Sequence, residues 1–146
     1  MKYDEIKNLI TLKTFPAKID EWVNVSAYLE EVLEKEGVAT PSIIQITIVL
    51  EELFVNIAHY AYVGTGHDEE GEMQLGTAVK DGAVYLVFID KGIPFDPLAK
   101  KDPDLDTSLE EKPIGGLGIY MAKKWASDIA YERINDQNIL MFKKKL

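Results

Sequence analysis

The chain has 146 residues, enough for one domain with its own hydrophobic core. Its net charge of -9 and pI of about 4.7 make nucleic acid an unexpected partner, because an acidic surface repels phosphate backbones. The charge fits either simple solubility or a basic protein partner. Without cysteines, disulfides and thiolate chemistry are excluded, which fits a cytoplasmic location. We see no signal peptide and no run of about 18 apolar residues, so we expect no membrane segment.

A strand and two helices are predicted in the first half of the chain. Residues Lys7 to Phe15 alternate as a strand does. Residues from Ile19 to Glu36 have the three- and four-residue spacing of an amphipathic helix, and Gly37 is suited to end it. Thr40 is expected to cap a second helix, with Pro41 as its first residue. This helix is apolar on most sides, so we expect it to be central, and Gly64 and Gly66 end it.

Strand pairs dominate the second half. Residues Glu72 to Lys80 and Ala83 to Asp90 flank the hairpin turn Asp81-Gly82. An irregular stretch from Lys91 to Pro113 holds four of the six prolines and is expected to be functional or mobile. A helix over Gly116 to Trp125 and a last strand pair, Ser127 to Ile134 and Asn138 to Lys144 around Asn135-Asp136-Gln137, complete the order. The order predicts a single α+β domain over residues 1–146, a two-layer sandwich with a largely antiparallel mixed sheet and about three helices on one face.

Three polar groups stand out against this pattern. Glu52 and Asn56 are four residues apart and share one face of the apolar central helix, where they need a ligand, a metal ion, water or the solvent edge. Glu51 points elsewhere and is expected to be solvated. Asp90 ends an apolar strand, and Gly92 after it allows either a close backbone approach or a positive φ; an acidic turn, which is common, is the alternative.

The third group is a glycine cluster, Gly115, Gly116 and Gly118, at the start of a predicted helix. Glycines there expose backbone N–H groups beside the positive end of a helix, which suits a phosphate group. The cluster fits neither the Rossmann nor the P-loop pattern.

Taken together and in this order, the three groups resemble the GHKL family of histidine-kinase-like ATPases, which have the Bergerat fold. Within it the chain is most similar to the anti-sigma-factor serine/threonine kinases of bacterial partner-switching systems. Glu52 to Tyr62 resembles the N box, Asp90 to Pro97 (DKGIPFDP) the G1 box, and Gly115 to Tyr120 the G2 box; the terminal LMFKKKL resembles the last strand.

The resemblance implies a role for each matching residue. ATP and Mg²⁺ are the implied cofactors, with Asn56 coordinating the metal ion. Glu52 is the implied general base, and Asp90 accepts a hydrogen bond from the adenine amino group while Gly92 lets the base lie close. The glycines Gly115, Gly116 and Gly118 hold phosphates, and residues 98–113 form the ATP lid.

The sequence departs from the family pattern at two places, and it contains two histidines. The segment before the glycines has no Arg, and Lys112 lacks the fork geometry of a guanidinium group. Asn138-Ile139 stands where relatives have a Gly-Thr contact to adenine. His59 is one residue before the usual histidine slot, which holds Tyr60, and is expected to be an ordinary packed or surface residue. His67 lies in a polar turn and is expected in solvent.

Three functions follow as hypotheses. The first is a kinase that phosphorylates a STAS-domain antagonist and sequesters a sigma factor or similar target. The second is a non-catalytic module in which ATP or ADP changes the shape offered to a protein partner, which the missing Arg favours. The third is an interaction protein with an empty pocket. A homodimer is expected from the resemblance alone; Trp22 and Tyr28 fit either an interface or the core.

Overall fold

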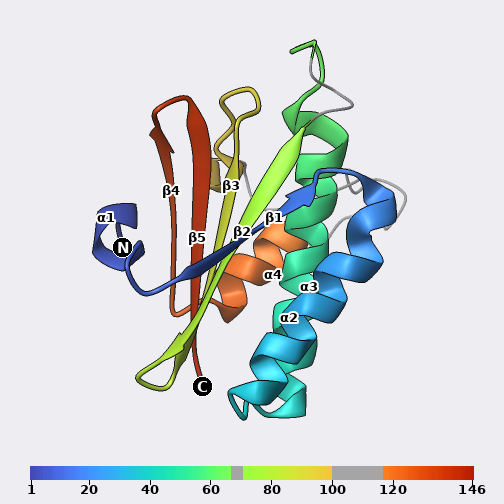
Figure 1. The fold of residues 1–146 in the computed structure, drawn as a ribbon. Coiled ribbons are helices and arrows are strands. Elements are labelled where there is room, and N and C mark those ends of the chain that lie inside the picture. The colour runs from blue at the N-terminus through green and yellow to red at the C-terminus, as the bar shows by residue number, and fades with distance from the viewer. Residues whose placement is uncertain (67–70, 100–116) are drawn as a thin grey trace, which may run out of the picture.

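The computed structural model describes residues 1–66, 71–99 and 117–146, and in these ranges helices cover a five-stranded sheet (Figure 1). The strands are β1 (Thr11–Pro16), β2 (Glu72–Lys80), β3 (Ala83–Asp90), β4 (Asp128–Ile134) and β5 (Gln137–Lys145). The helices are α1 (Tyr3–Ile6), α2 (Trp22–Lys35), α3 (Thr40–Asn56) and α4 (Leu117–Trp125). A π-helical turn (Ile57–Ala61) continues α3, and short 3₁₀ turns cover Ile19–Glu21 and Pro97–Ala99.

The strands are arranged in the order β1-β2-β3-β5-β4, with β3 at the centre. Every pairing among the described strands is antiparallel, so the expected mixed sheet is antiparallel throughout this part of the chain. Asp81 and Gly82 both have positive φ, 50° and 74°, as the predicted two-residue hairpin requires. The register places Asp90, the last residue of β3, directly opposite Asn138 of β5.

Several predicted boundaries were wrong. β1 begins at Thr11 and not at Lys7, because residues before it form α1 and a turn closed by the Leu9 N–H on the Ile6 carbonyl. Thr40 is not the cap of α3, because Ala39 has the extended backbone of the N-cap position. The last hairpin turns through two residues rather than three.

In that hairpin, Asn135 and Asp136 have φ of 50° and 62°, so both are in the left-handed region that a two-residue turn requires. Gln137 therefore belongs to β5, and this strand pair begins at Asp128 rather than Ser127.

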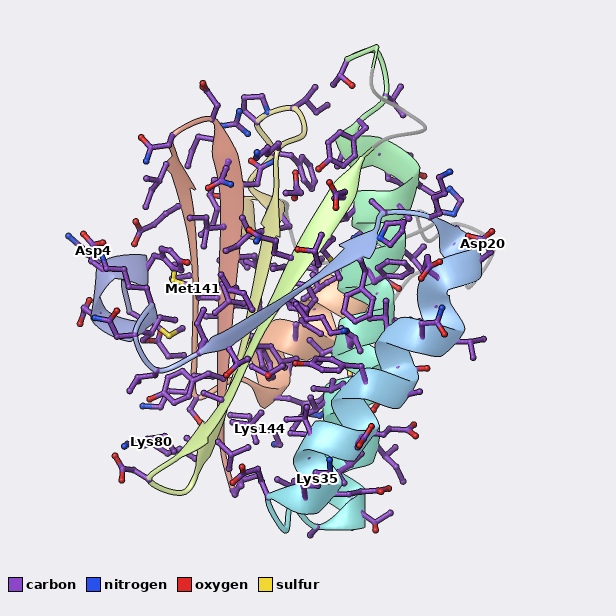
Figure 2. The ribbon with its side chains drawn as sticks, viewed as in Figure 1. Asp4, Asp20, Lys35, Lys80, Met141 and Lys144 are labelled. Atoms are coloured by element: carbon purple, nitrogen blue, oxygen red, sulfur yellow. The ribbon has the colours of Figure 1, made fainter. Side chains whose placement is uncertain are left out.

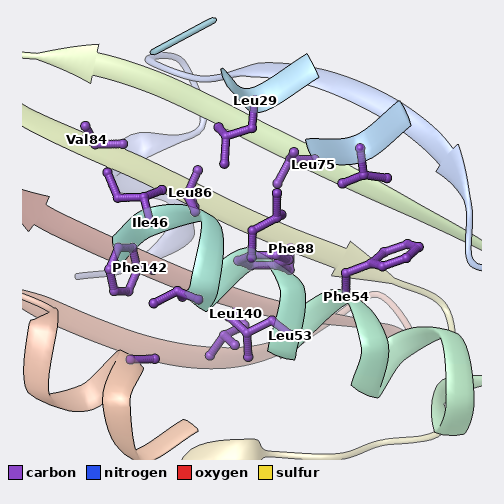
Figure 3. Close-up of a cluster of buried hydrophobic side chains, with 14 of the residues drawn as sticks. Leu29, Ile46, Leu53, Phe54, Leu75, Val84, Leu86, Phe88, Leu140 and Phe142 are labelled. Carbon is purple, nitrogen blue, oxygen red and sulfur yellow. The ribbon is translucent and has the colours of Figure 1, made fainter. Parts of the chain in front are cut away.

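Helices α2, α3 and α4 lie on the inner face of the sheet, with α3 between the other two (Figure 1). Alternate residues of the central strands point at α3, and Figure 3 shows the side chains of both layers meeting. Removing this apolar surface from water is the main force holding the layers together. Fully buried members of the cluster include Leu29, Ile46, Leu50, Phe54, Leu86, Phe88 and Phe142.

The outer face of the sheet carries a smaller cluster that the sequence pattern did not predict. Helix α1 lies over this face (Figure 1). The prediction of about three helices on one face did not include this short helix on the other face. Met141 lies on this side, near α1 (Figure 2). Ile6 of α1 is buried against the strands, together with Val87, Ile89, Ile139 and Met141.

The continuous helix Thr40–Ala61 is long and apolar enough, by length and composition, to cross a membrane. In the fold it is the central helix of the core, and it contacts α2 on one side and α4 on the other. Burial of Ile46, Leu50 and Phe54 accounts for part of its apolar composition, while Ile44 and Ile48 are exposed.

Truncating Phe54 should destabilise the fold strongly. Its ring is fully buried and stacks on Trp22, with ring centroids 6.0 Å apart. We expect Phe54→Ala to lower the free energy of unfolding by about 3–5 kcal/mol in urea denaturation. Val23→Ala, at a side chain that is 72% exposed on α2, is the control and should cost less than about 0.5 kcal/mol. Equal losses in the two variants would contradict this assignment of the core.

Candidate functional site

The C-terminal half of α3 contributes the polar pair predicted from the sequence. Glu52 and Asn56 lie one helical turn apart, and both line a cavity between α3 and the sheet. Both side chains are partly buried, and neither makes a hydrogen bond or ion pair with another described residue. Glu51 points away and is exposed, as expected. The cavity end of α3 therefore offers a carboxylate and a carboxamide that are available to a ligand.

The helix ends in the π-helical turn Ile57–Ala61, and the loop after β3 closes onto it. The N–H of Ile93 donates to the carbonyl oxygen of Ala61 at 2.8 Å. A Cβ atom on Gly92 would lie 2.2 Å from that same oxygen. The φ of Gly92 is not in the left-handed region, so of the two reasons considered for this glycine, the close approach is the one that applies. A side chain here would push the loop away from the helix.

Asp90 lies at the end of β3 and is only 6% exposed. Its Oδ1 accepts hydrogen bonds from the Gly92 N–H and from Nδ2 of Asn138, both at 2.9 Å. Its Oδ2 accepts none from the described residues and belongs to the side chain that lines the cavity. Burial raises the pKa of Asp90, against the opposing effects of Asn138, the Gly92 N–H and the nearby charge of Arg133.

The cavity has a volume of about 610 Å³, within the range of about 300–1,000 Å³ that is usual for small-molecule sites. Its lining is mostly apolar, with few polar side chains that converge from different elements. Phe88 and Leu140 contribute from the sheet, Ile119 from α4, and Ile93, Phe95 and Pro97 from the loop after β3. An apolar chamber with Asp90, Glu52 and Asn56 on its wall suits a flat, partly polar ligand.

Of the three glycines predicted to hold phosphates, the structure describes one. Gly118, near the start of α4, lies against α3: a Cβ atom there would lie 1.8 Å from Cγ of Glu52. The N-terminus of α4 is therefore close to the polar pair of α3. Gly115, Gly116, Lys112, His67 and nearly all of the predicted lid 98–113 lie outside the described residues.

His59 is exposed and, with Tyr60, lines the cavity. The two rings are 5.8 Å apart. Ala99 and Leu98, the described part of the predicted lid, form the end of the 3₁₀ turn after Pro97.

Four positioning residues were not predicted. Asn138 hydrogen-bonds to Asp90, and the Tyr131 hydroxyl donates to Oδ1 of Asn138 at 2.5 Å. Arg133 donates from Nη1 to the Gly92 carbonyl at 2.9 Å. Tyr62 donates to the Glu72 carbonyl at 2.5 Å and accepts from the Lys91 N–H at 3.0 Å, which ties the end of α3 to β2 and β3. The sequence contained a signal for Asn138 alone, because Asn138-Ile139 stands where relatives have a Gly-Thr contact to adenine.

Comparison with known families identifies the family of the domain. Residues 15–144 match the model of the histidine kinase-like ATPase domain. This chain belongs to that family. The resemblance seen in the sequence is thereby confirmed, and the α+β architecture of the histidine kinase-like ATPase domain agrees with the observed sheet and helices.

Relatives of this histidine kinase-like ATPase domain include serine-protein kinases. Serine-protein kinase RsbW of Bacillus cereus (strain AH820) is 25% identical over 132 residues, which are 88% of this chain and 80% of that protein. Serine-protein kinase RsbW of Oceanobacillus iheyensis is 27% identical over 128 residues, 84% of this chain and 76% of that protein.

A crystal structure of the RsbU and RsbW domains of Rv1364c from Mycobacterium tuberculosis has the same fold. It superposes with a TM-score of 0.63 at 19% identity. The match covers 93% of this chain but only 32% of that longer chain, so the likeness concerns the fold alone.

Substituting Gly92 should loosen the contact between the loop and α3. The Cβ of Gly92→Ala would overlap a backbone oxygen, which cannot rotate away, so we expect a loss of about 1–3 kcal/mol in the free energy of unfolding. Lys91→Ala, at the exposed neighbouring position, is the control and should be nearly neutral. Chemical denaturation of both variants tests this, and a neutral Gly92→Ala would contradict the close approach.

The raised pKa of Asp90 predicts a pH-dependent stability. The folded chain binds this proton more readily than the unfolded chain between the ordinary value of 3.8 and the raised one. The wild type should therefore gain stability relative to Asp90→Asn as pH falls through this window, and lose it as pH rises. Melting temperatures of both proteins from about pH 7 to about pH 4 measure the difference, and a difference that moves the other way would show that the pKa is lowered.

Proposed function

We propose that this protein binds ATP with Mg²⁺ and acts as a serine/threonine protein kinase of the anti-sigma-factor type. The observation that carries the proposal is that Asp90, Glu52 and Asn56, from distant parts of the chain, line one cavity. Membership of the histidine kinase-like ATPase domain family and the RsbW relatives support the same reaction class.

The Asp90 side of the cavity would hold the adenine ring. The side chain of Asp90 lines a mostly apolar wall, its Oδ2 accepts no hydrogen bond from the described residues, and the 6-amino group of adenine is a donor. Because a buried donor or acceptor without a partner costs about 1–3 kcal/mol, this bond would contribute selectivity as well as affinity. The close fit of Gly92 on α3 keeps the loop from filling the space of the base.

The α3 side would hold the phosphates. The oxygen of the Asn56 carboxamide is a hard ligand that suits Mg²⁺, and among the described residues no cluster of three acidic or histidine side chains competes for a metal ion. When bound, Mg²⁺ neutralises charge on the phosphates. Backbone N–H groups at Gly115, Gly116 and Gly118, with the start of α4, would bind phosphate oxygens.

Glu52 would act as the general base. The hydroxyl oxygen of the protein substrate attacks the γ-phosphorus, the bond from that phosphorus to the bridging oxygen of ADP breaks, and the hydroxyl proton passes to the Glu52 carboxylate. ADP leaves with the bond electrons. Glu52 suits this role because it is partly buried on the cavity wall beside Gly118, at the phosphate end.

The partners would be proteins. We propose a STAS-domain antagonist as the phosphorylated substrate and a sigma factor or similar regulator as the sequestered target, in the cytoplasm, with a homodimer as the expected assembly. The net charge of -9 favours basic surfaces on these partners over nucleic acid.

A second candidate is a nucleotide-binding module without kinase activity. The specific observation in its favour is that the sequence from Glu110 to Ile114 contains Lys112 and no Arg, so no guanidinium precedes the glycines to stabilise the transferring phosphoryl group. In this case ATP or ADP would bind in the same cavity and would alter only the surface presented to a partner.

Nucleotide binding is tested by calorimetry with ADP and Mg²⁺. We expect the wild type to bind and Asp90→Asn to bind at least about tenfold more weakly, because two donors hold Oδ1 and turn the new amide group towards the adenine amino group. Wild-type protein that binds no nucleotide would leave the third hypothesis, an interaction protein with an empty pocket.

Phosphoryl transfer is tested with radiolabelled ATP and STAS-domain proteins from the same genome. Glu52→Gln should retain nucleotide binding and lose at least about a hundredfold in transfer rate, because the amide cannot accept the proton. Glu51→Gln is the matched control, since the same change is made one residue away on the exposed side of α3. Tight nucleotide binding without transfer in the wild type would favour the second candidate.

A further inference from the structure

Asn138 is one of the few polar side chains buried in the described part of the chain, at 6% exposure. It lies on β5 directly opposite Asp90 and has a partner at each of its four hydrogen-bonding positions. Its Nδ2 donates to Oδ1 of Asp90 at 2.9 Å and to the Ile93 carbonyl at 2.8 Å. Its Oδ1 accepts from the Tyr131 hydroxyl at 2.5 Å and from the Phe95 N–H at 3.2 Å.

The chemistry of these partners permits only one orientation of the amide group. The carboxylate of Asp90 and the carbonyl of Ile93 can only accept, so they must face the NH₂ group. The backbone N–H of Phe95 can only donate, so it must face the oxygen. A flipped amide would place like groups together at three of the four contacts. Asn138 is therefore fixed, with no hydrogen-bonding capacity left for a ligand.

This fixed amide engages one oxygen of the Asp90 carboxylate and leaves the other as an acceptor. The Asn138 NH₂ group and the Gly92 N–H together hold Oδ1, so the carboxylate cannot rotate without leaving a buried donor unpaired. Oδ2 remains as the free acceptor. The same amide holds the loop after β3 at two points, Ile93 and Phe95, whose side chains line the cavity.

We propose that Asn138 is a positioning residue that makes the cavity selective for nucleotides with an amino group at purine position 6. The proposal rests on the proposed function, namely that the cavity holds a purine nucleotide. A 6-amino group donates to the fixed Oδ2, whereas a 6-oxo group brings a second acceptor against it. Tyr131 assists by holding the far side of the Asn138 amide.

The first test compares ATP and inosine triphosphate, which differ at purine position 6, by calorimetry with Mg²⁺. The wild type should prefer ATP by at least about tenfold. In Asn138→Ala, Asp90 keeps only the Gly92 donor and can rotate, so the Kd for ATP should rise about tenfold while that for inosine triphosphate changes less than about threefold. Asn8→Ala, the same change at an exposed position, should leave both constants unchanged.

If Asn138 had a purely structural role, Asn138→Ala would weaken the binding of both nucleotides equally and leave the ratio of their Kd values unchanged. This result would overturn the proposal. Melting temperatures without nucleotide record any general loss of folding in Asn138→Ala.

The second test does not depend on that variant. In Asp90→Asn with Asn138 intact, the two donors hold the new amide oxygen, so its NH₂ group must face the cavity. The preference should then invert, with inosine triphosphate binding at least about threefold more tightly than ATP. A variant that still prefers ATP would overturn the proposal. Wild-type protein that binds neither nucleotide would instead remove the proposed function, so the two failures can be told apart.

Discussion

The constraint on which the site depends is the burial of one carboxylate. Asp90 ends the central strand almost out of contact with solvent, and a buried charge is tolerated only where donors compensate for the lost water. Asn138 and the Gly92 N–H supply them. To do so, β5 must pair with β3 in one register, and the chain after β3 must turn back at once. The sheet, the loop and the base of the cavity are therefore set by the same requirement.

Helix α3 serves the core and the cavity with different parts of its surface. Its apolar side, with Ile46, Leu50 and Phe54, packs between the sheet and α2, while Glu52 and Asn56 lie one turn apart beside the cavity. The rigid packing of one side holds the polar pair of the other in position. The carbonyl of Ala61, which an ordinary helix end would leave unpaired, receives the N–H of Ile93 and fastens the loop.

Much of the fold was predictable because its signals are local. The hairpin Asp81-Gly82 and the apolar central helix follow from turn chemistry and periodicity, and the structure confirms both. The short helix α1 was missed because four residues carry too little periodicity, and the π-helical turn because its extra residue leaves no pattern in the sequence. Thr40 was misplaced by one position because Ala39 has the cap geometry without a capping side chain.

The site was predictable only through the family resemblance. Glu52 and Asn56 could be paired by their spacing, but nothing local indicates that Asp90 faces them across a cavity. Asn138 was harder still, because its role depends on the strand opposite it, 48 residues earlier in the chain. Which residues face each other across two strands depends on the strand register. The register is set by the pairing of the whole sheet and cannot be read from one short segment of sequence.

Register also gives the turn Asn135-Asp136 a consequence beyond its own surroundings. Its two left-handed residues fix the offset between β4 and β5, so Tyr131 and Asn138 both project to the inner face. Inserting one residue into this exposed turn, with β4 and the two-residue turn geometry held in place, would move Gln137 into the position opposite Asp90 and turn the Asn138 side chain to the other face of the sheet. An insertion at the surface can therefore alter the cavity without replacing any residue that lines it.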